Sequence, residues 1–218
     1  MDYLQNLYST ILLKDVIARK QIRNVDFLER LVNYLADNIG SLFSASNISK
    51  YLKSQRQQLP TQMVIDYSTA LSQAYFLYKV SRADIQGLKI FEIGEKYYFE
   101  DLGIRNAICG INPLSDIQKW MENLVYMQLL RLGYQVLVGK IDTLEIDFIA
   151  HRLEERIYLQ VSFRIEAERT RDREMAPLLR VSDHFPKYII TLDDFTTGIT
   201  PEGINIVHLR DFLFMESL

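Results

Sequence analysis

Cysteine is almost absent from this sequence, which contains only Cys109. One thiol cannot form an internal disulfide, so no disulfide framework holds the chain together. Metal sites built from several cysteines are excluded for the same reason. The low cysteine content favours a reducing compartment, and we expect the protein in the cytoplasm.

Long apolar segments are also missing. No run approaches the roughly 18 apolar residues that a membrane-spanning helix needs. The first five residues, MDYLQ, lack the basic and apolar regions of a secretory signal. These absences predict a protein without a membrane partner.

Two common catalytic signatures do not occur. The three histidines, at positions 151, 184 and 208, lie far apart and form no H-E-x-x-H pair. No G-x-x-x-x-G-K-[ST] phosphate loop is present, so we expect no ATP hydrolysis by that route. The net charge of -3 argues against nucleic-acid binding by the whole surface, although a local basic face stays open.

What is present is an ordinary globular composition. The 218 residues are 48% hydrophobic and 24% charged, which fits one large or two small domains. The segment 111–116, INPLSD, has the composition of a linker. We therefore expect a helical domain at residues 1–111 and an α/β domain at residues 112–218.

The first domain begins with apolar residues at helical spacing. This spacing predicts helices at 3–19, 24–39, 44–52 and 59–71, followed by strands at 75–80, 89–93 and 96–99. Asp101 is expected to cap a further helix. Two short helices followed by a hairpin outline a winged helix, whose second helix would enter the DNA major groove.

Basic residues gather in this winged-helix region. The residues we expect to contact nucleic acid are Lys50, Lys53, Arg56, Thr61, Gln62 and Lys79. The presumed recognition helix itself contains no Arg or Lys, whereas DNA-binding proteins use several cations on phosphates. Docking of a protein partner therefore stays open as the alternative.

The second domain alternates helices with strands. We expect a helix at 120–130, strands at 134–138, 144–150 and 156–162, a helix through Met175 to Leu179, and strands at 187–192 and 204–209. This order predicts an α/β fold (α+β for the whole chain) with mixed strand directions. The charge run 166–174 is expected to form a solvated helix face, because its acids offset its arginines.

Four residues of this domain form a candidate site. Glu122 lies on the first helix, Asp147 on the second strand, and Gln160 and Ser162 near the end of the third. The layout resembles that of PD-(D/E)XK nucleases, the restriction-endonuclease-like group, whose acids hold Mg²⁺ through hard oxygen ligands. Under this resemblance Glu122 and Asp147 match two metal-binding acids, Gln160 replaces the third acid, and Ser162 replaces the lysine.

The order of short motifs along the chain carries a wider resemblance. These motifs include YYFEDLGIR at 97–105, ENLV at 122–125, EIDFI at 145–149 and YLQVS at 158–162. They resemble the C-terminal part of uncharacterised prokaryotic ATPases, in which an AAA-type domain precedes a winged helix and a PD-(D/E)XK-like domain of unknown function. The resemblance implies an AAA-type ATPase domain, absent from this chain, as a partner.

Two hypotheses follow. The first is a binding or regulatory module without catalysis or cofactor, which recognises nucleic acid or a protein through a degenerate nuclease fold. The second is a Mg²⁺-dependent DNA endonuclease that uses Glu122 and Asp147, with Gln160 as a weak ligand. Lys140 or Arg164 would then replace the missing lysine.

Overall fold

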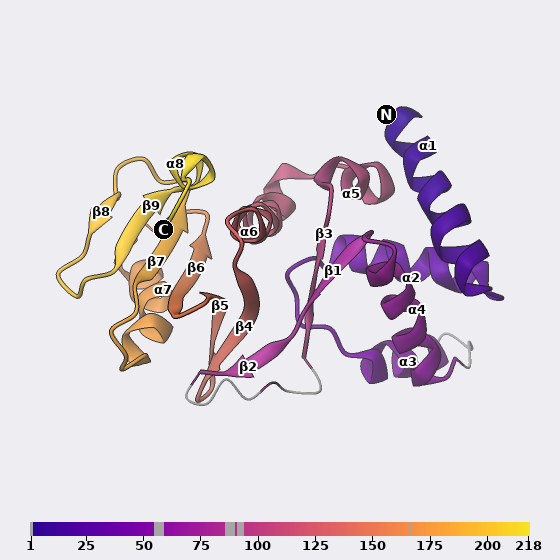
Figure 1. Ribbon diagram of the computed structural model, residues 1–218, viewed down its shortest axis with the longest axis horizontal. Coiled ribbons are helices and arrows are strands. Elements are labelled where there is room, and N and C mark those ends of the chain that lie inside the picture. Colours follow the sequence, from indigo (N-terminus) through magenta and orange to yellow (C-terminus); the bar gives the residue numbers. More distant parts are fainter. Residues whose placement is uncertain (1, 55–58, 86–89, 91–93, 166) are drawn as a thin grey trace. The chain divides into compact units, whose positions relative to one another are not determined.

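The structure, a computed structural model, describes residues 2–54, 59–85, 90, 94–165 and 167–218 (Figure 1). It divides the chain into two compact units, and each unit is built from two segments. Unit 1 comprises Met1–Lys79 and Ile93–Asn112, and unit 2 comprises Val80–Glu92 and Pro113–Leu218. The division differs from the contiguous segments 1–111 and 112–218 because residues 80–92 join the second unit.

Unit 1 is mainly helical (Figure 1). Its helices are α1 (Asp2–Thr10), the π-helical η1 (Ile11–Ala18), α2 (Val25–Asp37), α3 (Ala45–Ser54), α4 (Thr61–Gln73) and α5 (Leu102–Cys109). Strands β1 (Leu77–Val80) and β3 (Lys96–Phe99) form a two-stranded sheet. The expected helices are confirmed, whereas most of the expected strand 89–93 lies outside the described residues.

Side-chain caps set where two of these helices begin. The Asn24 carboxamide oxygen accepts a hydrogen bond of 3.0 Å from the backbone N–H of Phe27, at the start of α2. The Asp101 carboxylate accepts one of 2.9 Å from the N–H of Ile104, as the sequence predicted. Each cap satisfies a backbone donor that has no partner within its helix.

A buried arginine ties α5 to α2. Arg105 is 1% exposed, and its Nε donates to the carbonyl oxygen of Ala36 at 2.9 Å. Its Nη1 donates to the side-chain oxygen of Asn106 at 3.0 Å. These bonds offset the cost of removing the guanidinium from water.

Unit 2 is built on a sheet of seven strands in the order β2-β4-β5-β6-β7-β9-β8. The strands are β2 (Arg82–Asp84), β4 (Gln135–Ile141), β5 (Leu144–Arg152), β6 (Glu155–Ser162), β7 (Lys187–Thr191), β8 (Gly198–Ile199) and β9 (Asn205–His208). The neighbours β4–β5, β5–β6 and β8–β9 run antiparallel, whereas β2–β4, β6–β7 and β7–β9 run parallel. The expected α/β class with a mixed sheet is therefore confirmed.

Helices cover both faces of this sheet. They are α6 (Pro113–Arg131), α7 (Glu168–Arg180) and α8 (Leu209–Phe214). The ring of Tyr126, on α6, lies 6.2 Å from that of Phe148. The next residue of β5, Ile149, belongs instead to the core cluster of Met175 and Leu178, on α7. Because successive strand residues point to opposite faces, α6 and α7 lie on opposite sides of the sheet.

Two local expectations need correction. Helix α6 begins at Pro113, so only Ile111 and Asn112 of the expected linker 111–116 precede the helix. Proline fits the first turn of a helix, where its missing N–H has no partner to lose. Strands β2 and β8 were not expected, since three and two residues are too short to show an alternating pattern.

Candidate functional site

Strands β5 and β6 separate where two of the predicted site residues lie. Their pairing runs from Arg152 opposite Glu155 to Phe148 opposite Leu159. Beyond that point residues 144–146 pair with β4, and residues 160–162 pair with β7. The sheet therefore opens between Asp147 and Gln160.

A β-bulge sits at the opening. Leu137 pairs with Ile149, and Gly139 pairs with Ile146, so two residues of β5 face one residue of β4. The extra residue lies at Asp147–Phe148. Bulges re-aim side chains and are common beside active sites. The bulge therefore lies where β5 and β6 separate, and it includes Asp147.

The side chains of Asp147 and Gln160 bridge the opening. The backbone N–H of Asp147 donates to Oε1 of Gln160 at 2.7 Å. In return, the backbone N–H of Val161 donates to Oδ2 of Asp147 at 2.9 Å. Gln160 is only 6% exposed. The two side chains thus take the place of the ladder hydrogen bonds that the separated strands lack.

Glu174, on α7, joins this cluster. Nε2 of Gln160 donates to Oε2 of Glu174 at 3.3 Å, and Arg173 donates to Oε1 at 2.6 Å. Burial raises the pKa of the Glu174 carboxyl, Arg173 lowers it in part, and the charge of Asp147 raises it further. The cluster therefore favours a proton on Glu174.

Of the run 166–174, expected to form a solvated helix face, Glu166 lies outside the described residues. Glu174 is an exception to that expectation. It is 8% exposed, while Arg173 beside it is 73% exposed at its side chain. The available signal was spacing, because Glu174 precedes the buried Leu178 by four residues and so shares the apolar stripe of its helix. The prediction considered the charge of Glu174 but not its spacing from Leu178.

Helix α6 places Glu122 on a face that reaches β6. One turn earlier, Gln118 donates to the carbonyl oxygen of Val161 at 2.6 Å and accepts from the N–H of Phe163 at 2.9 Å. Residues four apart share a helix face, so the half-buried Glu122 follows Gln118 along it. Gln118 was missed because a lone glutamine carries no motif.

Three residues were considered at or in place of the missing lysine: Ser162, Arg164 and Lys140. Ser162 is 4% exposed, and its hydroxyl donates to the carbonyl oxygen of Arg164 at 3.2 Å. The exposed guanidinium of Arg164 lies 5.2 Å from the ring centre of Phe163. Lys140 is half-buried on β4, in register with Glu145.

Two of the predicted site residues, Asp147 and Gln160, already accept hydrogen bonds within the sheet. Across the part of the chain that the structure describes, no group of three or more His, Cys, Asp or Glu side chains could hold a metal ion. Mg²⁺ takes oxygen ligands in near-ideal octahedral geometry. Asp147 and Gln160 instead each accept a backbone N–H, and Gln160 is neutral.

The residues predicted to contact nucleic acid belong to unit 1, and they differ in exposure and in their bonding partners. Lys50 and Lys53 are exposed on α3, and Thr61 begins α4. Gln62 donates to Asp66 at 2.8 Å, and Lys79 forms an ion pair of 3.4 Å with Glu95. Arg56 lies outside the described residues.

Fold and site together define a two-unit α/β protein, in which a small helical unit accompanies a bulged mixed sheet. The chain belongs to the family described as a domain of unknown function, DUF8612, whose model matches residues 1–115. An uncharacterised protein of Haemophilus influenzae (strain Rd) is 33% identical over 210 residues. That match covers 96% of this chain and 51% of the relative, so the chain spans about half the relative's length.

A solved structure, protein VC1899 from Vibrio cholerae, is 10% identical. The match covers 87% of this chain and 54% of that one, with a TM-score of 0.34. Within the described residues, no helix has the length and apolarity to cross a membrane.

Proposed function

We propose that the chain is a non-catalytic module that binds nucleic acid or a protein partner and regulates an AAA-type ATPase domain. Under this proposal unit 2 is a degenerate nuclease-like fold and unit 1 a winged helix. The observation that carries the proposal is the reciprocal bonding of Asp147 and Gln160. Both side chains hold the separated strands together, which is a use within the fold.

The charge of the cluster supports the same proposal. Hydrolysis of a phosphodiester at a metal site needs carboxylates for the ion and a cation near the reacting phosphate. The positions that would supply the third acid and the lysine carry the neutral Gln160 and Ser162, both buried. The Haemophilus relative is about twice as long as this chain, which leaves room in that protein for a further domain.

The test is incubation of the purified chain with supercoiled plasmid and either Mg²⁺ or Mn²⁺, beside the variant Asp147→Asn. Asparagine keeps an oxygen that can accept the Val161 N–H, so the variant removes the charge and preserves the bridge. We expect no nicking above the buffer control for either protein. The alternative, a Mg²⁺-dependent endonuclease using Glu122 and Asp147, is favoured if only the wild type cuts.

A second variant separates folding from chemistry. Asp147→Ala leaves the Val161 N–H without its acceptor, which costs about 1–3 kcal/mol of stability. Loss of cutting in Asp147→Ala alone, with Asp147→Asn still active, would therefore indicate unfolding. A nuclease that uses the carboxylate would lose activity in both variants while Asp147→Asn kept its stability.

A further inference from the structure

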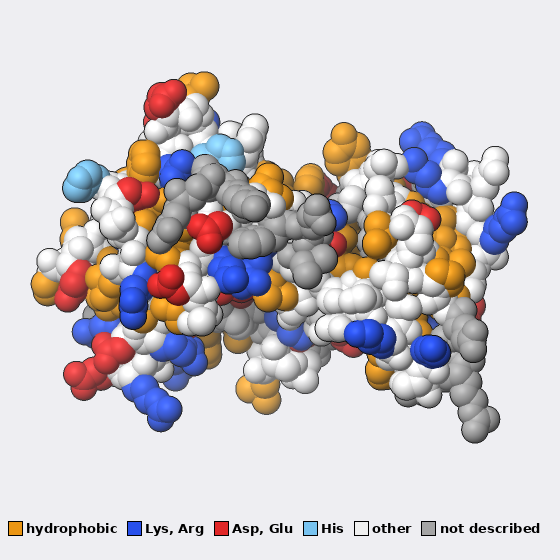
Figure 2. Space-filling model, turned by 90° about the horizontal axis from the view of Figure 1, so that it is seen from below, with side chains coloured by type: hydrophobic (Ala, Val, Ile, Leu, Met, Phe, Trp, Pro, Cys, Tyr) orange, Lys and Arg blue, Asp and Glu red, His pale blue; other side chains and the backbone are white. Residues whose placement is uncertain are grey.

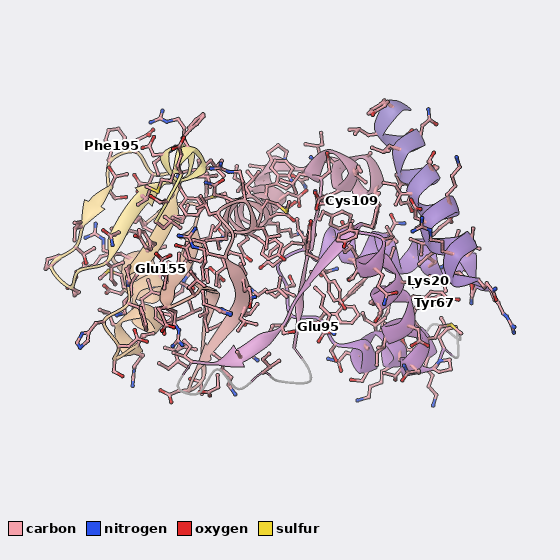
Figure 3. The ribbon with its side chains drawn as sticks, viewed as in Figure 1. Lys20, Tyr67, Glu95, Cys109, Glu155 and Phe195 are labelled. Atoms are coloured by element: carbon pink, nitrogen blue, oxygen red, sulfur yellow. The ribbon has the colours of Figure 1, made fainter. Side chains whose placement is uncertain are left out.

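A cavity of about 390 Å³ lies in unit 1, between the segment 20–23 and helix α4. Ligand pockets span roughly 300–1,000 Å³, so this one is large enough for a small molecule or one unit of a polymer. The half-buried Ile22 and Met63 and the buried Tyr67 supply apolar walls. Figure 3 labels Lys20 and Tyr67, which both line the cavity.

Tyr67 is held in place from two sides. Its hydroxyl accepts a hydrogen bond of 3.1 Å from the backbone N–H of Asn24. Its ring centre lies 5.4 Å from that of Phe27. A wall held by its neighbours loses little freedom when a ligand binds.

The mouth of the cavity is cationic. Lys20 and Arg23 both line it and are exposed, and neither forms an ion pair or side-chain hydrogen bond within the described part of the chain. Gln21, between them, has φ 50°, a left-handed conformation that is uncommon for a residue other than glycine. The turn that presents the two cations is therefore a specific backbone conformation.

Polar groups of α4 complete the lining. Thr69 and Gln73 are exposed beside the cavity. The Thr69 hydroxyl donates to the carbonyl oxygen of Ile65 at 2.8 Å, so toward a ligand it acts as an acceptor. The carboxylate in the lining, Asp66, accepts a hydrogen bond from Gln62 at 2.8 Å. A carboxylate near two cations suits a ligand that carries both negative charge and N–H donors.

We propose that this cavity binds one nucleotide of a single-stranded nucleic acid, with the base against Met63 and Tyr67 and the phosphates at Lys20 and Arg23. The base supplies an apolar face and amino donors, and the backbone supplies the charge. The inference rests on the proposed function and names the partner as nucleic acid. All the cavity residues lie within the segment 1–115 that the family model matches.

Helix α4 contains no Arg or Lys, so cations that contact phosphate beside it must come from other segments. Lys20 and Arg23 come from the segment before α2, and Lys53 with Thr61 lines a separate hollow at the start of α4. Helix α4 has 13 residues and is thus about 20 Å long. Neighbouring elements therefore supply cations along the exposed side of α4.

The test is fluorescence anisotropy with a labelled single-stranded 20-mer in EDTA at low salt, using the full chain. The variant is Lys20→Ala/Arg23→Ala, and its charge-matched control is Lys14→Ala/Arg210→Ala, two exposed cations outside the cavity. We expect the cavity variant to bind at least about tenfold more weakly, and the control less than about threefold. The slope of log K against log salt should fall by about 1.4 in the cavity variant, since each contact with a single strand contributes about 0.7.

The inference would be overturned by no binding by the wild type, by equal losses in both double variants, or by tighter binding of the matching duplex. Competition by a free mononucleotide at the concentration of the 20-mer would also overturn it, because it would indicate a small-molecule site. EDTA excludes metal-dependent cutting from this assay. A failure of single-strand binding would therefore overturn this inference, but the proposal of a non-catalytic module would hold with a protein as its partner. Plasmid cutting would overturn the non-catalytic proposal without changing the result of the binding assay.

Discussion

The two units use their charged side chains in different ways. Unit 1 has eleven Lys or Arg residues against nine Asp or Glu, whereas unit 2 has fourteen against nineteen. In Figure 2 the face shown for unit 1 carries blue side chains with few red ones, while that of unit 2 mixes both colours. The overall charge of -3 conceals this difference.

The difference is also one of bonding. In unit 2 the polar residues of the candidate site, Asp147, Gln160 and Glu174, bond to one another and to the backbone. In unit 1 the cations Lys20 and Arg23 stay unpaired at the surface, within the residues described. A group satisfied inside the fold contributes to stability, whereas an unpaired surface cation contributes little to it and is available to a partner.

The largest expected effect comes from Arg105, which is a cation of unit 1 but is buried and hydrogen-bonded inside the fold. Arg105→Ala should lower the stability of unit 1 by about 3 kcal/mol, since the buried carbonyl of Ala36 loses its donor. Hydrogen exchange resolved by peptide would show the loss in α2 and α5. The control Arg30→Ala removes an exposed ion pair with Asp26, of 3.1 Å, and should cost at most about 0.5 kcal/mol. Equal effects of the two variants would contradict the structural role of Arg105.

Gly139→Ala should have the next largest effect, in unit 2. An added Cβ would lie 3.0 Å from Cβ of Ile146 and 3.0 Å from Cγ1 of Ile149, which the bulge brings to one face. Overpacking of this kind costs roughly 1–3 kcal/mol. Urea denaturation followed by circular dichroism measures the loss. An unchanged midpoint would show that Ile146 and Ile149 can move to make room for the added methyl group.

The sequence predicted those parts of the fold that depend on local patterns. The cap at Asp101 and the long strands β4 to β6 follow from residue types at fixed spacing. Strand β2 does not, because Arg82–Asp84 gains its partner, β4, only through a contact between residues more than fifty positions apart. No local pattern carries that pairing.

The candidate site shows the same limit. Asp147 and Gln160 were predicted as site residues through the resemblance to PD-(D/E)XK nucleases, together with Glu122 and Ser162. That the side chains of Asp147 and Gln160 bond to the backbone of the neighbouring strand depends on the separation of β5 and β6 at this point. No residue type in the sequence predicts that separation. Glu174 reaches the cluster from a helix on one face, so its role appears only when helix and sheet are packed together.

The pH dependence of stability gives a test of Glu174 in unit 2, and we expect a smaller effect than that of Gly139→Ala. Burial raises its pKa, so the folded state holds the proton more tightly than the unfolded state. Stability should then fall as pH rises from about 4.3, the ordinary value for glutamate, through the raised folded pKa. Glu174→Gln, which keeps a partner for Gln160, should flatten this part of the curve and stabilise the protein at pH 7. Urea midpoints between pH 4 and 8 measure both, and identical slopes for wild type and variant would show that Glu174 ionises as freely as in the unfolded chain.

Lys20→Ala/Arg23→Ala should change stability least, by no more than about 0.5 kcal/mol, because both side chains are exposed and unpaired within the described residues. The same variant is expected to lose single-strand binding, so the two measurements together separate a ligand role from a structural one. A stability loss near that of Arg105→Ala would mean that the two cations hold the turn at Gln21 together, and would remove the contrast between the units. We expect a neutral or slightly stabilising change, since removing two like charges three positions apart in the sequence relieves their repulsion.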